Sequence, residues 1–107
     1  MIDWPRVKEL REEVGAEDFG EVVKIFLEEV ESVLEKLKAG GRSQLEQDLH
    51  FLKGSALNLG FEQFSALCLE GERAAAEGNS GSVSVETILA SFGASKAYFL
   101  KELPQRY

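Results

Sequence analysis

Cysteine and histidine are almost missing from this chain, whose 107 residues contain one of each. A single cysteine cannot form an intrachain disulfide bond, and this fits a reducing compartment. One histidine and one cysteine are also too few to supply the closed ligand set of a zinc site, so no metal site is expected. Cys68 is therefore predicted to be a small buried side chain and not a reactive thiol.

Long apolar runs, basic clusters and a signal sequence are missing as well. No apolar stretch approaches the roughly 20 residues that span a bilayer. The first residues, Met1 to Pro5, have neither a basic segment nor an apolar core of the signal-peptide type. The net charge of -7, without a stripe of Lys and Arg, disfavours nucleic acid and anionic lipid as partners. These absences predict a cytoplasmic protein whose partners are other proteins.

What is present is a repeated helical pattern in a chain long enough for one modest core. We expect residues 1–107 to form a single domain. Helices are predicted over about residues 3–14, 17–39, 43–59, 62–77 and 83–103, with Pro104 marking the end of the last one. No segment has a strand pattern. The fold class predicted is all-α, an antiparallel up-down-up-down four-helix bundle with an additional short N-terminal helix packed at one end.

The single histidine falls in the third predicted helix. Apolar residues of that helix recur at steps of three and four, and they are Leu45, Leu49, Leu52, Ala56 and Leu59. At about 100° per residue, His50 projects roughly 140° away from this stripe, so its ring is expected to be exposed. Gly54 follows one turn later and leaves that flank of the ring open. Taken alone, a lone histidine is most often a residue without chemistry.

His50 and the residues that follow it form a dense motif. They read His-x-x-Lys-Gly-Ser, then a small residue, then Leu-x-Leu-Gly ending at Gly60. This motif resembles the phosphoacceptor motif of histidine-containing phosphotransfer (HPt) domains, the helical carriers of multistep two-component phosphorelays. Length, helical pattern and motif position agree over nearly the whole chain. The resemblance implies that His50 accepts a phosphoryl group from the phosphoaspartate of a receiver domain and passes it to another receiver domain.

The chemistry of the motif is consistent with that role. A neutral imidazole is a competent nucleophile near neutral pH, because its unperturbed pKa is about 6.5. Phosphoryl transfer needs positioning and cations that neutralise the phosphoryl oxygens. Lys53 lies within side-chain reach of a phosphoryl group on His50, so it is a candidate for phosphoryl stabilisation. The alternative for Lys53 is a solvated helix lysine.

The sequence also lacks the means to use ATP. It has no Walker motif and no kinase-like glycine loop. We therefore expect a phosphocarrier without its own ATP-dependent kinase activity and without a cofactor. The resemblance implies that magnesium is supplied by the acidic pocket of the partner, a receiver domain of a response regulator or a hybrid histidine kinase.

The family pattern further implies a residue on the next helix that holds the ring nitrogen that is not phosphorylated. By spacing this residue is Glu72, whose carboxylate would favour the tautomer in which the other nitrogen is free to attack. An exposed helical glutamate without that role is an equal alternative. The basic residue that some relatives carry one turn further on is Ala76 here.

Docking of a receiver domain requires exposed apolar surface near His50. Leu57 is the first candidate, followed by Phe61 and then by Trp4 in the terminal segment. Trp4 and Phe61 could equally complete the core of the bundle. We expect the protein to act as a monomer. The second function considered is a non-catalytic helical adaptor that binds receiver domains. Gly54 argues against an adaptor, because a glycine in mid-helix costs about 1 kcal/mol and an adaptor has no need of it.

Overall fold

Helices account for most of residues 2–107, the part of the chain that the computed structural model describes. They are α1 (Trp4–Val14), α2 (Ala16–Lys38), α3 (Leu45–Leu59), α4 (Glu62–Ala76) and α5 (Val85–Arg106), with a short 3₁₀ helix, η1 (Ser80–Ser82), before α5. Within these residues the only β-type pairing is an isolated bridge between Ile2 and Phe61. The all-α prediction is confirmed. None of the described helices combines the length and the apolar character that crossing a bilayer requires.

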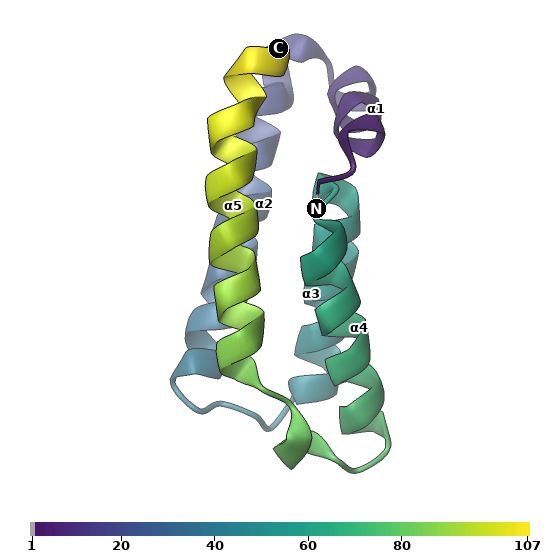
Figure 1. Cartoon of the computed structure of the whole chain (residues 1–107), viewed down its shortest axis with the longest axis vertical. Coiled ribbons are helices and arrows are strands. Elements are labelled where there is room, and N and C mark those ends of the chain that lie inside the picture. Colours follow the sequence, from purple (N-terminus) through teal and green to yellow (C-terminus); the bar gives the residue numbers. More distant parts are fainter. Residues whose placement is uncertain (1) are drawn as a thin grey trace.

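Consecutive long helices run in opposite directions (Figure 1). The sequence colours pass down α2, up α3, down α4 and up α5 to the C-terminus. The short α1 lies at the upper end of the bundle, above α3 and α4 in this view, and it contacts α2 and α3. The additional N-terminal helix therefore closes one end of a bundle that measures 42 × 21 × 20 Å.

A continuous apolar core joins the helices. Its fully buried members with the largest side chains are Phe61, Phe64, Phe99, Leu49, Leu52 and Leu59. Phe61 directly follows Gly60, which has the left-handed αL conformation, and the backbone N–H of Phe61 donates to the carbonyl of Ala56 at 2.9 Å. This turn directs the ring of Phe61 inward. A hydrophobic residue just after such a helix end often packs against the helix in this way. The ring meets Phe99 edge-on, 5.3 Å between centroids. Of the two roles left open for Phe61, the place in the core is therefore confirmed, and the place on an exposed docking surface is wrong.

The last helix also extends further than its proline suggested. α5 continues through Pro104 to Arg106, and the N–H of Tyr107 donates to the carbonyl of Leu103 at 3.1 Å. A proline in the final turn removes a single helical hydrogen bond, because it lacks only its own N–H, the donor to the carbonyl four residues earlier. The guanidinium of Arg106 lies over the ring of Trp4, 4.0 Å from its centroid, which anchors this turn. The predicted end of the helix at Leu103 is wrong for that reason.

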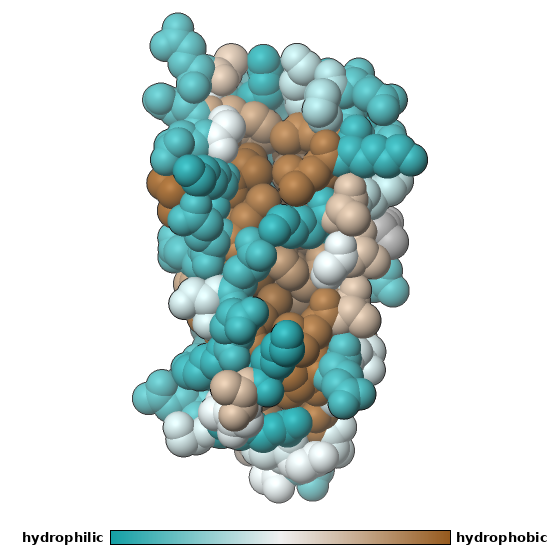
Figure 2. Space-filling view, turned by 90° about the vertical axis from the view of Figure 1, so that its left-hand side faces the viewer, coloured by the Kyte–Doolittle hydropathy of each residue, from teal (hydrophilic) through white to brown (hydrophobic). Residues whose placement is uncertain are grey.

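The pair α2 and α5 and the pair α3 and α4 differ in how closely their helices pack. Figure 2, which views the side formed by α2 and α5, shows apolar side chains along the middle of that face, flanked by hydrophilic ones. A groove there is lined by Val23, Leu27 and Leu103, and the Lys96–Glu31 ion pair joins the two helices at 3.0 Å. By contrast, α3 and α4 share the most extensive helix–helix interface in the molecule. The motif helix and its successor are therefore the most tightly coupled pair.

The corner between α3 and α4 depends on Gly60, which has φ +78°. A Cβ at this position would lie 2.7 Å from the backbone oxygen of Asp3. The N–H of Asp3 in turn donates to the carbonyl of Gly60 at 2.7 Å. Only glycine combines this backbone conformation with so close an approach, so the start of α1 is tied to the end of the motif helix through this residue.

We predict that Gly60→Ala destabilises the protein by about 2 kcal/mol or more, because it adds the cost of a left-handed alanine to a steric clash. Gly20→Ala is the matched control, since Gly20 is an exposed residue of α2 with open space at its Cβ position. There alanine is expected to stabilise by about 0.5–1 kcal/mol. Urea denaturation followed by circular dichroism measures both changes. Equal stabilities for the two variants would contradict this account of the corner.

Candidate functional site

His50 stands out from α3 into solvent. Its side chain is 68% exposed, while Leu49 and Leu52 on the opposite side of the helix are fully buried. The predicted exposure of the ring is confirmed. One turn further on, a Cβ at Gly54 would have no atom of another residue within 4 Å beyond its own helix backbone. The surface beside the imidazole is therefore open to an approaching group.

Glu72 of α4 links His50 to Lys53. Its Oε2 lies 2.9 Å from Nδ1 of His50, and its Oε1 lies 2.9 Å from Nζ of Lys53. The side chains of Lys53 and Glu72 are only 21% and 19% exposed. We call this arrangement the Glu72 bridge. One carboxylate thus contacts both of the motif residues that carry, or can carry, positive charge.

Helix geometry explains why these three side chains meet. The spacing of His50 and Lys53 places the two side chains on neighbouring turns of α3, with Lys53 nearer to the core side. Glu72 projects from α4 toward this flank of α3. Tertiary packing must set the position of α4 against α3, including the separation of the two helices, because the carboxylate has to reach both partners.

The charge state of the bridge follows from its neighbours. The ammonium of Lys53 is the largest influence and lowers the pKa of Glu72 from its usual 4.5; partial burial opposes this, and the His50 ring adds to the lowering. Glu72 is therefore ionised at neutral pH. A carboxylate can only accept hydrogen bonds, so its contact with Nδ1 requires the proton of the neutral ring to sit on Nδ1. The lone pair of His50 is then on Nε2.

Leu57 lies two turns beyond His50 and is 56% exposed. Its neighbour Asn58 accepts a hydrogen bond from Nη2 of Arg6 at 3.2 Å. This bond brings α1 close to the exposed side chain of Leu57. Trp4 is placed differently. Its ring stacks on Phe99, 5.8 Å between centroids, beneath the guanidinium described above. The structure therefore sets Trp4 against α5, which favours its alternative role in completing the core.

Two features of the site were missed at the level of sequence. Phe51, next to His50, is 38% exposed and adds apolar surface beside the imidazole. The helical spacing already contained this signal, because Phe51 also falls outside the buried stripe of α3. The ion pair between Lys53 and Glu72 had no signal in either helix alone, since it depends on how the two helices are packed.

Cys68 lies one turn before Glu72 on α4 and is buried. Burial, and to a lesser extent the charge of Glu72, raises the pKa of its thiol to about 12. The thiolate is therefore scarce at neutral pH, and the prediction of a buried side chain is confirmed. Among residues 2–107, no group of three or more His, Cys, Asp or Glu side chains is arranged to hold a metal ion.

Comparison with known families gives one match. A family model described as Hpt domain matches residues 21–105. The matched range contains His50, Lys53 and Glu72 and begins within α2. Neither the curated proteins nor the solved structures gave a match.

The lowered pKa of Glu72 predicts a pH-dependent contribution to stability. A carboxyl group whose pKa is lower in the folded state stabilises that state above its unfolded pKa and loses this effect as the pH falls through the folded pKa. Glu72→Gln is therefore expected to lower the free energy of unfolding by about 1 kcal/mol at neutral pH. The difference from the parent protein should shrink below pH 4.5. Denaturant titrations at several pH values measure it, and a difference that is constant down to about pH 3 would contradict the bridge.

Proposed function

This chain belongs to the Hpt domain family, and we propose that His50 accepts a phosphoryl group from the phosphoaspartate of one receiver domain and passes it to a second receiver domain in a multistep phosphorelay. Hpt domains carry out phosphotransfer in two-component phosphorelays, interact with receiver domains and have no kinase activity of their own. The observation that carries the assignment to His50 is the exposed ring whose Nδ1 is held by Glu72 at 2.9 Å.

The proposed transfer uses Nε2 as the nucleophile. Nε2 attacks phosphorus in line with the aspartyl oxygen, the N–P bond forms, and the P–O bond breaks as the aspartate carboxylate leaves with the electron pair. Nδ1 keeps its proton throughout, so the product ring is a phosphoimidazolium cation. The carboxylate of Glu72 lies against this ring and stabilises the positive charge that develops on it. Transfer to the second receiver is the reverse sequence.

Lys53 is proposed to neutralise the phosphoryl oxygens. An ammonium has three donors, so Lys53 can keep its contact with Glu72 and still donate to a phosphoryl group on the ring. Its pairing at 2.9 Å restrains the side chain near His50 before the phosphoryl group arrives, which reduces the entropy lost when it binds. This argues for a role in the site rather than for a freely solvated lysine.

The receiver domain is proposed to dock on the surface formed by His50, Gly54, Leu57 and Phe51. Two of these residues are exposed and apolar, and Gly54 leaves room between them. Because the protein carries a net charge of -7, long-range electrostatics oppose its approach to the acidic pocket of a receiver, and apolar contact is expected to supply most of the affinity. Magnesium is proposed to belong to that pocket and to arrive with the receiver.

The assignment of the acceptor is tested with His50→Gln. Receiver domains phosphorylated with acetyl phosphate and Mg²⁺ serve as donors, and the label is expected on the parent protein only, acid-labile and alkali-stable as a phosphoramidate is. An exposed side chain contributes little to folding, so the variant should keep its helix content and lose no more than about 0.5 kcal/mol of stability. Label on His50→Gln would refute the assignment. Binding of receivers by the parent protein without any phosphate uptake would instead favour the adaptor.

Chemistry and docking are separated by two substitutions. Lys53→Ala is expected to slow transfer with little change in receiver affinity, because the charge acts on the phosphoryl group. Leu57→Glu is expected to weaken receiver binding by about 1–3 kcal/mol, because it places a charge in the apolar contact. Rapid-quench kinetics and titration calorimetry on each variant distinguish the two effects. Equal losses of affinity in both variants would mean that the roles of Lys53 and Leu57 are assigned wrongly.

A further inference from the structure

The distance between α3 and α4 beside the Glu72 bridge is limited by two residues, one on each helix. Each of them directly precedes a residue of the bridge. Gly71 directly precedes Glu72, and Leu49 directly precedes His50. Both are buried, Leu49 completely. A Cβ at Gly71 would lie 2.9 Å from Cδ1 of Leu49, well inside a normal van der Waals contact. Because Gly71 has no side chain, α4 can lie this close to α3 without displacing the end of the Leu49 side chain.

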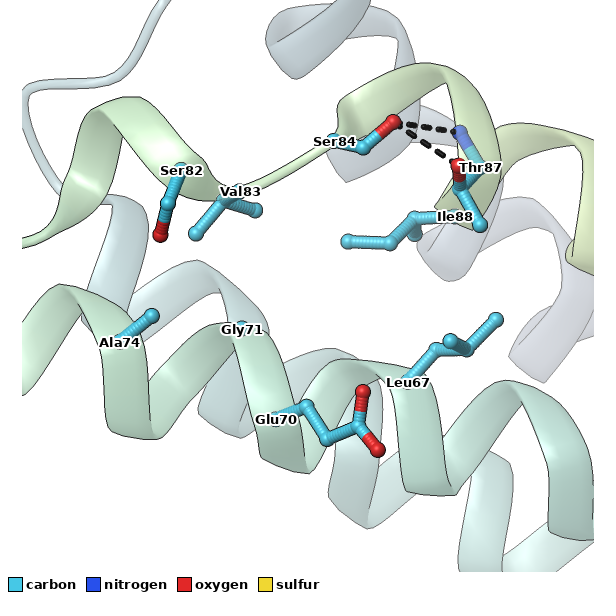
Figure 3. Close-up of a pocket in the computed structure, with 9 residues that line it drawn as sticks. All are labelled: Leu67, Glu70, Gly71, Ala74, Ser82, Val83, Ser84, Thr87 and Ile88. Atoms are coloured by element: carbon cyan, nitrogen blue, oxygen red, sulfur yellow. Dashed lines mark hydrogen bonds between the residues drawn. The ribbon is translucent and has the colours of Figure 1, made fainter.

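The opposite side of Gly71 is less restrictive. Figure 3 shows that Val83 and Ile88 face Gly71 across a groove, which lies between α4 on one side and the segment before α5 and the first turn of α5 on the other. The same Cβ would lie 3.4 Å from Cγ1 of Val83 and 3.8 Å from Cδ1 of Ile88. These two side chains border a groove of about 310 Å³ and have space to move into. Leu49 is enclosed by the core, so the strain of an added methyl group falls on the α3 side.

From this geometry we infer that Gly71 is a positioning residue for the imidazole of His50. It sets the separation of α3 and α4 at which the carboxylate of Glu72 reaches Nδ1, and so it selects the Nδ1–H tautomer of the ring. A methyl group at Gly71 moves α4 outward at this level. The outward shift lengthens a contact that is now 2.9 Å beyond the range of about 2.7–3.2 Å that N–H···O hydrogen bonds occupy. The inference rests on the proposed function only where it concerns the rate of phosphotransfer.

The test is Gly71→Ala, with Gly93→Ala as the matched control. Gly93 is a helical glycine of α5 with no atom near its Cβ position. The readout is the tautomer of the neutral, unphosphorylated His50 ring, measured from the ¹⁵N chemical shifts of its two nitrogens. The parent protein and Gly93→Ala are expected to show mainly Nδ1–H. Gly71→Ala is expected to show a mixture of the tautomers and to accept phosphate about tenfold more slowly.

A second pair of variants separates positioning from general loss of packing. Leu49→Val removes the atom that the new methyl group would meet, and by itself it is expected to leave the tautomer unchanged. In the double variant Leu49→Val/Gly71→Ala, the Nδ1–H tautomer and the transfer rate are expected to return toward those of the parent protein. The double variant also decides the question if Gly71→Ala alone does not fold, because its clash has been removed.

The outcomes bear separately on Gly71 and on the proposed function. A folded Gly71→Ala protein with the parent tautomer would overturn the inference, as would a folded double variant in which Nδ1–H is not recovered. A shifted tautomer without any change in transfer rate would support the role of Gly71 in orienting the ring and would contradict the part proposed for Glu72 in phosphotransfer. Failure of the parent protein to accept phosphate would refute the function alone, since the tautomer is measured without phosphate.

Discussion

The sharing of one carboxylate between His50 and Lys53 is the interaction on which the site depends. Glu72 holds Nδ1 of the ring and Nζ of the lysine, each at 2.9 Å. The same carboxylate fixes the tautomer that leaves the lone pair on Nε2, and it holds the ammonium of Lys53 on the Nδ1 side of the exposed ring. Because the lysine lowers the pKa of Glu72, the carboxylate that accepts these contacts is ionised at neutral pH. Removing any one partner changes the environment of the other two.

A contact of this kind requires rigid elements close together. The bridge spans two helices with the most extensive interface in the bundle, and their connection is fixed by the turn at Gly60 and its hydrogen bond to the start of α1. Sites carried on packed helices hold their geometry better than sites on loops. The looser face between α2 and α5 lies on the other side of the bundle (Figures 1 and 2). Tight packing is therefore concentrated where the imidazole must be oriented.

Helical periodicity was sufficient to predict the helices and the exposure of His50, because both depend on the side-chain pattern within a single helix. Other local signals failed: the proline did not end α5 at Leu103, and Phe61 is buried, because these features depend on a contact with α1 and on a turn. Glu72 was identified by family spacing, and its distance to the ring could be known only from the packing of α4 on α3. The same holds for its pairing with Lys53. The sequence alone therefore could not predict contacts between side chains on two different helices.

The central claim is that Glu72 makes Nε2 the nucleophile, and the identity of the phosphorylated nitrogen tests it most directly. The protein labelled with ¹⁵N in its single histidine is phosphorylated by a receiver domain, and the nitrogen bonded to phosphorus is identified from its ¹⁵N–³¹P coupling. The account predicts that phosphorus is bonded to Nε2 while Nδ1 retains its proton. A phosphoryl group on Nδ1 would contradict it, because Glu72 could not then hold that nitrogen during transfer.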